Sequence, residues 1–241
     1  KRQNLPESWD PNTERISEDT FEKCFGFSMN MIQKEMIHTI ESCKKPGLFI
    51  LEAPMGTGKT EAALAAVELL ATKCNKKGLF FGLPTQATAN SIFERVVQWA
   101  KLQSCDAVHS INLAHQNAEF QSVFAELKND SMLQTDLDGE SGLEVNAFFS
   151  GSKMSLLADF VVATVDRFLM SVLKKKHAML LHLGLSQKVV IVDECHAYDA
   201  YMNLYLDTAL AWLHEYHAPV ILLSATLPCD RRKALVEAYI N

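Results

Sequence analysis

The stretch LFILEAPMGTGKTEAALAAVELL (48–70) decides the fold of this chain. It begins with an apolar run, LFIL (48–51), continues through the turn APMGTGKT (53–60), and ends in a helix-forming segment, EAALAAVELL (61–70). A buried strand, a glycine-containing turn and a helix, in that order, are typical of a phosphate-binding loop. Ala53 stands where such a loop usually has its first glycine. Because both flanking segments agree with the motif, we predict a nucleotide site here.

The residue types in the turn indicate how phosphate would be held. Gly56 and Gly58 allow the backbone to turn its N–H groups toward phosphate oxygens, and the following helix adds its positive N-terminal end. Lys59 can reach the β- and γ-phosphates, and the Thr60 hydroxyl can ligate magnesium. The residues of this turn that we expect to contact ATP are Pro54, Met55, Gly56, Thr57, Gly58, Lys59, Thr60 and Glu61.

Composition limits the function classes. The 241 residues suffice for one large α/β domain or two small ones, and 48% apolar and 22% charged residues are ordinary for a globular protein. A net charge of −6 argues against a constitutive, sequence-independent nucleic-acid coat, although it leaves room for a local strip of phosphate contacts. The six cysteines include no C-x-x-C pair, so we expect no disulfide framework, no structural zinc site and a reducing compartment.

The chain carries no targeting or membrane signal that we recognise. No apolar run is long enough to span a bilayer, and the start, KRQNLPESWD, lacks a signal-peptide core. It also lacks an initiator methionine, so we expect a piece of a longer protein.

Alternating apolar runs and helix-forming segments predict the architecture. Six runs predict buried strands: LFIL (48–51), LFFGL (79–83), AVHSI (107–111), FVVAT (160–164), VVIVD (189–193) and VILLS (220–224). Helices are expected between them at 60–72, 86–101, 115–128, 166–175, 200–216 and 230–240. This order predicts a doubly wound α/β fold, with about six or seven mostly parallel strands and helices on both faces. In such folds ligands bind at the carboxyl ends of the strands.

Two segments do not fit the alternation. Residues 1–20 are polar and contain proline, which favours a linker or a loosely packed arm. Residues 128–146 are acidic with few apolar positions, and we expect a long surface loop there, with room for a short helix.

Two further motifs follow buried strands. In IVDECHAYD (191–199), Asp193 is placed to hold magnesium, and Glu194 to orient or deprotonate an attacking water. An Asp-Glu pair alone would be interpreted as a solvated turn, but together with the upstream phosphate loop it favours a catalytic site. In LLSATLP (222–228), Ser224 and Thr226 can hydrogen-bond across the site, although a bare S-A-T tripeptide would be an ordinary strand exit.

The order of GKT, DExH and SAT, each closing a buried strand, resembles the first RecA-like lobe of superfamily-two helicases. PTQATAN (84–90) and ATVDRF (163–168) look like the motifs of that superfamily that contact a nucleic-acid strand. Gln33 is placed like the upstream glutamine that reads adenine. The resemblance implies nucleic-acid contacts from Thr85, Gln86, Thr88, Thr164 and Arg167. The alternatives are that Thr85 and Thr88 cap a helix and that Arg167 is a surface residue.

A closer resemblance covers the chain from about residue 27 to its end. DECHAYDAYM (193–202), the pair Trp212 and Leu213, PVILLSATLP (219–228) with Arg231, TVDRFL (164–169) and KHAMLLHLGLSQKVVIVDE (176–194) are similar to the CRISPR-associated helicase–nuclease of type I interference. The resemblance implies an arm at 1–26 and a first RecA-like ATP-binding helicase domain at 27–241.

What that family does is then an expectation for this chain. The resemblance implies an ATP hydrolase and single-stranded DNA helicase that uses ATP and magnesium, in the cytoplasm of a prokaryote and without a membrane. It also implies recruitment to an R-loop by a guide-RNA surveillance complex of the Cascade type. Carried over residue by residue, it assigns triphosphate and magnesium binding to Lys59 and Thr60, magnesium binding to Asp193 and the catalytic base to Glu194. His196 would couple the site to the partner lobe, and Ser224 and Thr226 would link hydrolysis to DNA movement.

The sequence also departs from the family. Cys195 replaces a more usual apolar residue, no His-Asp pair of a metal-dependent HD nuclease precedes Gln33, and Arg231 and Arg232 lie too close to SAT to serve as the second lobe's arginines. We therefore expect the second RecA-like lobe and the HD nuclease in the same or a companion chain. The isolated lobe should bind nucleotide weakly and turn over little.

Two other functions remain open at this point. One is a generic DExH RNA helicase lobe, against which the HAYD extension argues. The other is a nucleotide-gated protein-binding module, which would not need Glu194 as a base. The histidines lack H-x-x-x-H or H-E-x-x-H spacing, and the basic runs at 174–176 and 231–233 are typical of helix ends and faces.

Overall fold

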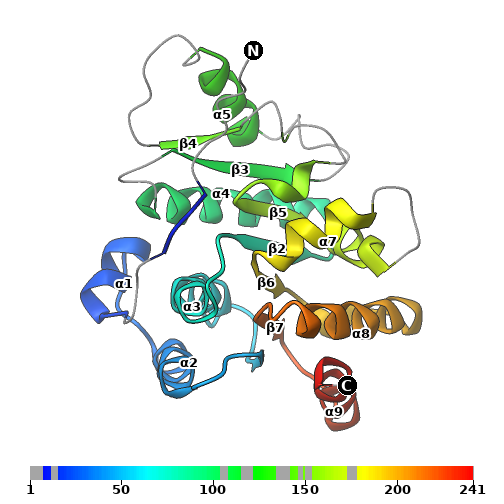
Figure 1. Cartoon of the computed structure of the whole chain (residues 1–241). Helices are drawn as coiled ribbons and strands as arrows, with labels where there is room; N and C mark the ends of the chain where they lie inside the picture. Colours follow the sequence, from blue (N-terminus) through cyan, green and yellow to red (C-terminus); the bar gives the residue numbers. More distant parts are fainter. Residues whose placement is uncertain are drawn as a thin grey trace.

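A computed structural model describes residues 8–11, 16–103, 108–114, 122–133, 142–145, 149, 154–172 and 178–240. Within these, one sheet of seven strands has the order β1-β7-β6-β2-β5-β3-β4, and every neighbouring pair is parallel (Figure 1). The strands are β1 (Leu48–Glu52), β2 (Leu79–Leu83), β3 (Val108–Ala114), β4 (Gly142–Glu144), β5 (Phe160–Thr164), β6 (Val189–Val192) and β7 (Val220–Ser224). The predicted doubly wound α/β architecture is confirmed.

Helices cover both faces of the sheet, as Figure 1 shows. One face packs against α1 (Glu18–Phe25), α2 (Met31–Ser42), α3 (Lys59–Cys74), α4 (Gln86–Gln103) and α5 (Ser122–Leu133). The other packs against α6 (Val165–Leu169), α7 (Ala178–Ser186), α8 (Ala200–Glu215) and α9 (Cys229–Ile240). Successive strand residues point to opposite faces, so Ile191 joins the first core cluster and Val190 and Val192 the second. Because β2, β6 and β7 are buried throughout, their sequences are nearly continuous apolar runs.

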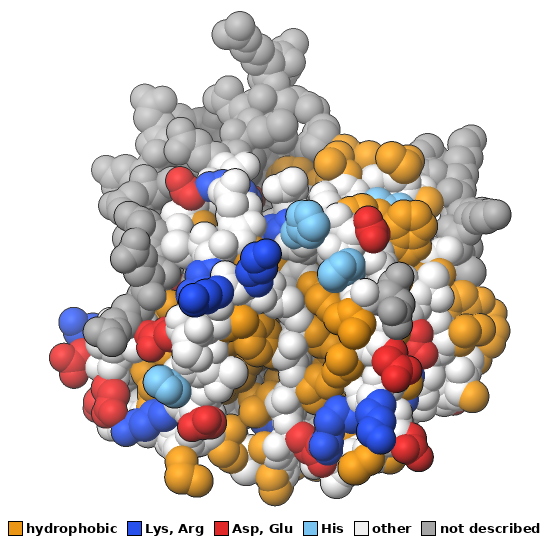
Figure 2. Space-filling view, turned by 60° about the horizontal axis from the view of Figure 1, so that its bottom comes forward, with side chains coloured by type: hydrophobic (Ala, Val, Ile, Leu, Met, Phe, Trp, Pro, Cys, Tyr) orange, Lys and Arg blue, Asp and Glu red, His pale blue; other side chains and the backbone are white. Residues whose placement is uncertain are grey.

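The edge strand β1 is less covered than the central strands. Leu48, Phe49, Ile50 and Leu51 are half-buried, and β1 pairs only with β7 among the described strands. An apolar groove of about 480 Å³ runs between β1 and α2. Figure 2, with the lower part of the molecule turned forward, shows hydrophobic side chains on this side lying between charged ones. This edge therefore presents apolar surface along the strand that leads into the phosphate loop.

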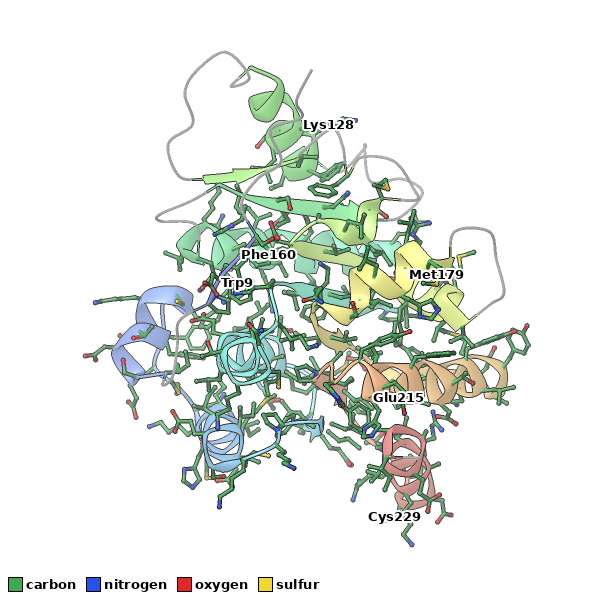
Figure 3. All side chains as sticks on the ribbon, viewed as in Figure 1. Trp9, Lys128, Phe160, Met179, Glu215 and Cys229 are labelled. Atoms are coloured by element: carbon green, nitrogen blue, oxygen red, sulfur yellow. The ribbon has the colours of Figure 1, made fainter. Side chains whose placement is uncertain are left out.

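The N-terminal arm is packed, contrary to the prediction for residues 1–20. Trp9 is only 2% exposed and meets Trp99 edge-on, with ring centroids 5.8 Å apart, and Phe160 at 5.3 Å (Figure 3). Ser17 caps α1 by accepting from the Thr20 amide. For the described part of the arm, the linker prediction is wrong. Its apolar residues are too sparse to show a local period, and they are buried against distant partners.

The acidic segment 128–146 is not simply a loop. Helix α5 extends to Leu133, and β4 pairs with β3 in parallel, with Val108 opposite Gly142. The short helix allowed for in the prediction is present as the end of α5, the loop prediction is wrong at 142–144, and residues 134–141 lie outside the described part. Strand β3 runs further than predicted, and the expected helix at 115–128 is placed at 122–133. A short edge strand is stabilised by its neighbour, and local composition does not reveal that neighbour.

The remaining differences concern helices. Helices α1, α2 and α7 were not predicted, and the helix expected at 166–175 is divided into α6 and a 3₁₀ turn at Met170–Val172. The lysine run at 174–176 lies outside the described residues. Arg231 and Arg232 face carboxylates, Asp207 and Glu52, as expected for a helix face. The cysteines that the structure describes are free thiols. Over the described ranges, no helix is long and apolar enough to cross a membrane.

Candidate nucleotide site

The turn after β1 has the backbone shape that a phosphate loop needs. Gly56 and Gly58 both have φ of +77°, in the left-handed region that favours glycine. A side chain at Gly58 would also collide with Gln33, because its Cβ would lie 2.4 Å from the Gln33 Nε2 atom. Helix α3 begins directly after Gly58, so its unpaired N-terminal N–H groups face the turn. The Ala53 N–H donates to the Ser224 carbonyl at 3.1 Å, which joins this turn to the end of β7.

Lys59 is folded back over the turn. Its Nζ atom donates to the Ala53 carbonyl at 2.6 Å and to the Pro54 carbonyl at 3.2 Å, and the residue is 8% exposed. Both acceptors are neutral, so they orient the ammonium group without neutralising its charge. A phosphate that entered the turn would therefore meet a cation that is already in place.

Gln33 and Asn30 attach α2 to the turn. The two residues form a capping box at the start of α2, in which Gln33 Oε1 accepts from the Asn30 N–H at 2.9 Å. Asn30 Nδ2 donates to the Thr57 carbonyl at 2.9 Å, and Gln33 Nε2 to the Gly58 carbonyl at 3.2 Å. Gln33 borders the pocket described below, but it is fully buried and both polar atoms of its carboxamide bind backbone. An adenine contact by Gln33 stays a prediction.

Two carboxylates follow β6. The Asp193 N–H continues the sheet by donating to the Gly82 carbonyl at 2.9 Å, and Asp193 Oδ1 accepts from the Glu194 N–H at 2.9 Å. Burial, and then the nearby charge of Glu194, raise the pKa of Asp193 to about 6. A cation between Asp193 and Glu194 would offset the repulsion between their two negative charges. Glu194 also has φ of +52°, which is unusual for a residue with a side chain.

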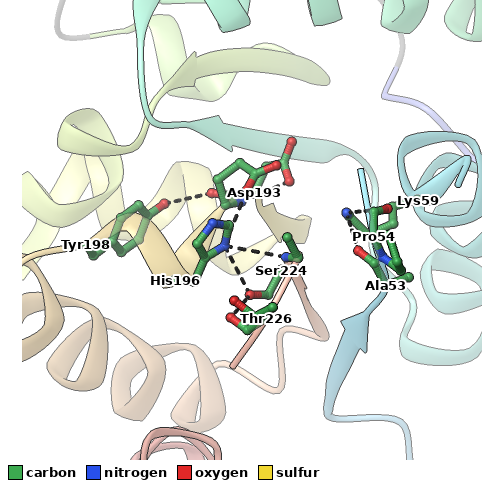
Figure 4. Close-up of polar contacts among 10 residues, drawn as sticks. Ala53, Pro54, Lys59, Asp193, His196, Tyr198, Ser224 and Thr226 are labelled. Atoms are coloured by element: carbon green, nitrogen blue, oxygen red, sulfur yellow. Dashed lines mark hydrogen bonds and ion pairs between the residues drawn. The ribbon is translucent and has the colours of Figure 1, made fainter. Parts of the chain in front are cut away.

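His196 connects Glu194 with the end of β7, and its contact with Ser224 is drawn in Figure 4. Its Nδ1 atom lies 3.3 Å from Glu194 Oε2 and 3.2 Å from Ser224 Oγ. The Ser224 hydroxyl donates its single proton to the Thr226 carbonyl at 2.8 Å. The Ala225 N–H approaches the same His196 nitrogen at 3.4 Å, so Nδ1 lies among Glu194, Ser224 and the backbone of the turn after β7.

These groups meet around one pocket of about 420 Å³. It lies where the carboxyl ends of β1 and β6, both neighbours of β7, come together. The residues that line it are Phe27, Asn30, Gln33, Met55, Gly56, Thr57, Gly58, Lys59, Thr60, Glu61, Arg95, Asp193 and Glu194. Of the predicted set, Pro54, His196, Ser224 and Thr226 do not line it. Pro54 holds Lys59 through its carbonyl, and the other three extend from Glu194 toward β7.

Sequence reasoning missed Phe27, Asn30 and Arg95. Arg95 lies on α4 and pairs with Glu61 at 3.0 Å. The pattern Asn30-x-x-Gln33 could have revealed Asn30, since it is a capping-box spacing. Nothing local marks Phe27 or Arg95, because their placement depends on how α1 and α4 pack.

The donor set fits a magnesium–nucleotide complex. Thr60 and Asp193 line the same pocket and offer one hydroxyl and one carboxylate. Among the residues that the structure describes, no group of three or more His, Cys, Asp or Glu side chains could hold a metal alone. Magnesium commonly takes one or two protein ligands and fills its remaining positions with phosphate and water oxygens. Two ligands beside a phosphate loop suit that mode.

The residues expected to contact nucleic acid lie at the ends of β2 and β5, which pair directly, with Leu83 opposite Thr164. Thr85 and Thr88 cap α4 reciprocally. The Thr88 N–H donates to Thr85 Oγ1 at 3.1 Å, and the Thr85 N–H donates to Thr88 Oγ1 at 3.2 Å. The helix-cap alternative is therefore present, although both side chains remain exposed.

The other three candidates are differently placed. Thr164 precedes α6 without capping it through its side chain, and Gln86 is the first residue of α4. Arg167 donates from Nη2 to Ser155 Oγ at 2.9 Å, and burial lowers the pKa of its guanidinium. Nucleic-acid contact by these residues stays a prediction.

Comparison with known proteins agrees with this geometry. A family model described as DEAD/DEAH box helicase matches residues 30–235. The CRISPR-associated nuclease/helicase Cas3 of Streptococcus thermophilus is 49% identical over 243 residues, covering 100% of this chain and 26% of that protein. A crystal structure of T. fusca Cas3 with ADP is 36% identical with a TM-score of 0.77, and the match covers 93% of this chain and 24% of that chain.

A further similar structure is one chain of a multi-chain complex. A chain in a pre-nicking CRISPR RNA-guided surveillance complex is 34% identical with a TM-score of 0.63, over 88% of this chain and 20% of that one. The chain thus spans a fifth to a quarter of the length of these relatives. The phosphate loop and the DECH carboxylates line one pocket, and Ser224 of the SAT motif contacts both segments. The chain belongs to the DEAD/DEAH box helicase family, as its first RecA-like lobe.

Proposed function

We propose that this lobe binds and hydrolyses ATP with magnesium, as part of a protein that moves along or unwinds single-stranded DNA in CRISPR interference. One observation carries the proposal: Lys59, after the turn that follows β1, and the neighbours Asp193 and Glu194, after β6, line a single pocket at the strand ends. The Cas3 names of the relatives supply the biological setting, and the ADP in one of them supports nucleotide binding here.

Lys59, Thr60 and Asp193 bind the substrate in this proposal. Lys59 Nζ exchanges the Ala53 and Pro54 carbonyls for phosphate oxygens, while the N–H groups at the start of α3 donate to the same phosphates. The Thr60 hydroxyl and the Asp193 carboxylate would hold magnesium, which would supply positive charge beside the phosphates. Asp193 would bind it in the ionised form, whose charge burial and Glu194 disfavour in its absence.

Glu194 acts as the base. Its carboxylate orients a water molecule and accepts the proton that the water loses as it attacks. The His196 Nδ1 contact at 3.3 Å keeps one carboxylate oxygen on the side of Ser224. Through Ser224 and the Thr226 carbonyl, a change at Glu194 reaches the turn after β7. That turn is where hydrolysis would be coupled to movement of DNA.

The partners follow from the relatives and from the strand ends. We place single-stranded DNA across the ends of β2 and β5, where Thr85, Gln86, Thr88, Thr164 and Arg167 gather. A second RecA-like lobe and an HD nuclease would belong to the same or a companion chain. A Cascade-type surveillance complex would recruit the protein, as the surveillance-complex relative suggests.

The test is magnesium-dependent ATP hydrolysis by the full-length protein, with and without single-stranded DNA, for the wild type and for Glu194→Gln. We expect DNA to stimulate the wild type, and Glu194→Gln to keep ATP binding but lose turnover by about a hundredfold or more. The isolated lobe should bind ATP and show little turnover.

Three results would overturn the proposal. Stimulation by RNA but not by DNA would indicate an RNA helicase. ATP binding without hydrolysis in the full-length wild type would indicate a nucleotide-gated binding module. Robust DNA-stimulated turnover by the isolated lobe would show that no second lobe is needed.

A further inference from the structure

Tyr198 is a buried polar side chain next to the site that the proposed mechanism does not use. It follows the short 3₁₀ turn Cys195–Ala197 and precedes Asp199, the N-cap of α8. The residue is 7% exposed, and its hydroxyl donates to the Asp193 carbonyl at 3.0 Å (Figure 4). The hydroxyl therefore contacts the backbone, and not the carboxylate, of the residue expected to hold magnesium.

The Asp193 carbonyl belongs to the same planar peptide unit as the Glu194 N–H. That N–H donates to Asp193 Oδ1 at 2.9 Å. Both polar groups of this peptide are thus fixed, one by Tyr198 and the other by the Asp193 carboxylate. Because the unit is rigid, its orientation sets where the Asp193 and Glu194 side chains point.

The same peptide sets the φ angle of Glu194. At +52° this angle lies in the left-handed region, which is unfavourable for a residue with a Cβ atom. Such a conformation persists only where the surroundings enforce it. Rotation of the peptide toward a negative φ would break the Tyr198 hydrogen bond and redirect both carboxylates.

Tyr198 is itself held firmly enough to impose this geometry. Its ring lies in the core cluster on the α8 face of the sheet, and its own carbonyl accepts from Asn203 Nδ2 at 3.0 Å. Burial raises the pKa of the phenol well above its usual range, so the hydroxyl remains a donor at every pH of interest. The ring thus transmits the position of α8 to the peptide between the two carboxylates.

We propose that Tyr198 is a positioning residue for ATP hydrolysis: its hydroxyl holds the Asp193–Glu194 peptide in the orientation that aims Asp193 at magnesium and Glu194 at the attacking water. This inference rests on the proposed function and deepens it. It assigns to Tyr198, in the HAYD segment, the role of orienting the two carboxylates.

The test compares Tyr198→Phe with Tyr239→Phe in the full-length protein. Tyr239 is a matched control, because it is 6% exposed and its hydroxyl donates to the Ala218 carbonyl, also at 3.0 Å, at the opposite end of β7. Both changes remove one buried hydroxyl and leave the ring. We expect Tyr198→Phe to lower the kcat of ATP hydrolysis by about tenfold or more, with the KM for ATP within about twofold. Tyr239→Phe should leave both kinetic constants unchanged, while the two variants lose similar thermal stability.

Equal kcat values for the two variants would overturn the proposal, as would a rise in KM without a fall in kcat. The wild type and Glu194→Gln are measured beside them. If the wild type does not hydrolyse ATP, the proposed function fails, and a crystal structure of full-length Tyr198→Phe decides the positioning role. A changed φ at Glu194 would support it, and an unchanged φ would overturn it.

Discussion

Two parts of the same sheet edge are built differently. At the ends of β1, β6 and β7, side chains from separate loops converge, and two contacts join the loops: His196 Nδ1 lies 3.2 Å from Ser224 Oγ, and the Ala53 N–H donates to the Ser224 carbonyl. At the ends of β2 and β5, Thr85 and Thr88 bind their own helix. The loops around the nucleotide pocket are thus joined to one another within the lobe. On the side expected to meet DNA, the hydroxyls of Thr85 and Thr88 stabilise the start of α4.

Removal of the Lys59 ammonium should have the largest effect on the nucleotide half. We expect Lys59→Ala to reduce ATP hydrolysis by the full-length protein by about a hundredfold or more, because the charge that stabilises the transferring phosphate is lost. The measurement is steady-state phosphate release. Lys73→Ala is the matched control, since Lys73 lies on the same helix and also donates to two carbonyls, those of Glu41 and Cys43. Equal loss in the two variants would mean that Lys59 acts through the stability of α3.

The buried, ionised Asp193 carboxylate should lower the free energy of unfolding of the lobe at neutral pH. Burial raises its pKa to about 6, whereas an unfolded aspartate titrates near 4. Between these values the folded state binds a proton that the unfolded state does not, so this residue's contribution to stability falls as pH rises through the window. Without magnesium, Asp193→Asn should be about 1–3 kcal/mol more stable than the wild type at pH 7.5, and the difference should shrink toward pH 4.

The experiment is thermal unfolding of both proteins across that pH range in the presence of a chelator. Asp166→Asn, an exposed carboxylate on α6, is the control and should change stability little at any pH. A stability gain that does not depend on pH would show that the raised pKa is not its source.

On the DNA half, Thr85 should matter first for folding. Thr85→Ala removes the acceptor for the Thr88 N–H and should cost about 1 kcal/mol in the free energy of unfolding, whereas Thr85→Ser keeps the cap. Urea denaturation measures this. The affinity of both variants for single-stranded DNA is measured as well. If Thr85→Ala loses stability but keeps its affinity for DNA, the DNA assignment of Thr85 fails.

Arg167 should give the smallest effect. If its guanidinium contacts one phosphate, Arg167→Gln should weaken single-stranded DNA binding about threefold and reduce the salt slope by about 0.7. Ser155→Ala removes the hydroxyl that accepts from Arg167 Nη2 and keeps the charge, so its salt slope should stay that of the wild type. Fluorescence anisotropy at several salt concentrations measures both. If the salt slope of DNA binding is unchanged in Arg167→Gln, Arg167 does not contact phosphate and its role is structural.

Much of the fold and of the nucleotide site could be predicted where a signal is local. Gly56, Lys59 and Thr60 lie in one turn between a strand and a helix, and Asp193 and Ser224 each end a buried apolar run. Trp9 and β4 could not be predicted in the same way, because their burial depends on Trp99, Phe160 and β3, which are distant in sequence. The polar partners of Gln33 likewise depend on α2 lying against the phosphate loop.

Six of the seven described strands, the phosphate loop and the identity of the two carboxylates could be read from the sequence alone. Each of these depends on residue types and spacings within one short, contiguous segment of the sequence. Only the tertiary structure decided that β7 lies between β1 and β6, which brings Lys59 and Glu194 to one pocket. It also decided that Gln33 donates to the Gly58 carbonyl and that His196 meets Ser224, across separations of 25 and 28 residues in the chain. The physical reason is that a hydrogen bond between distant residues forms only after apolar burial has set the distance between them, and a linear pattern does not contain that distance.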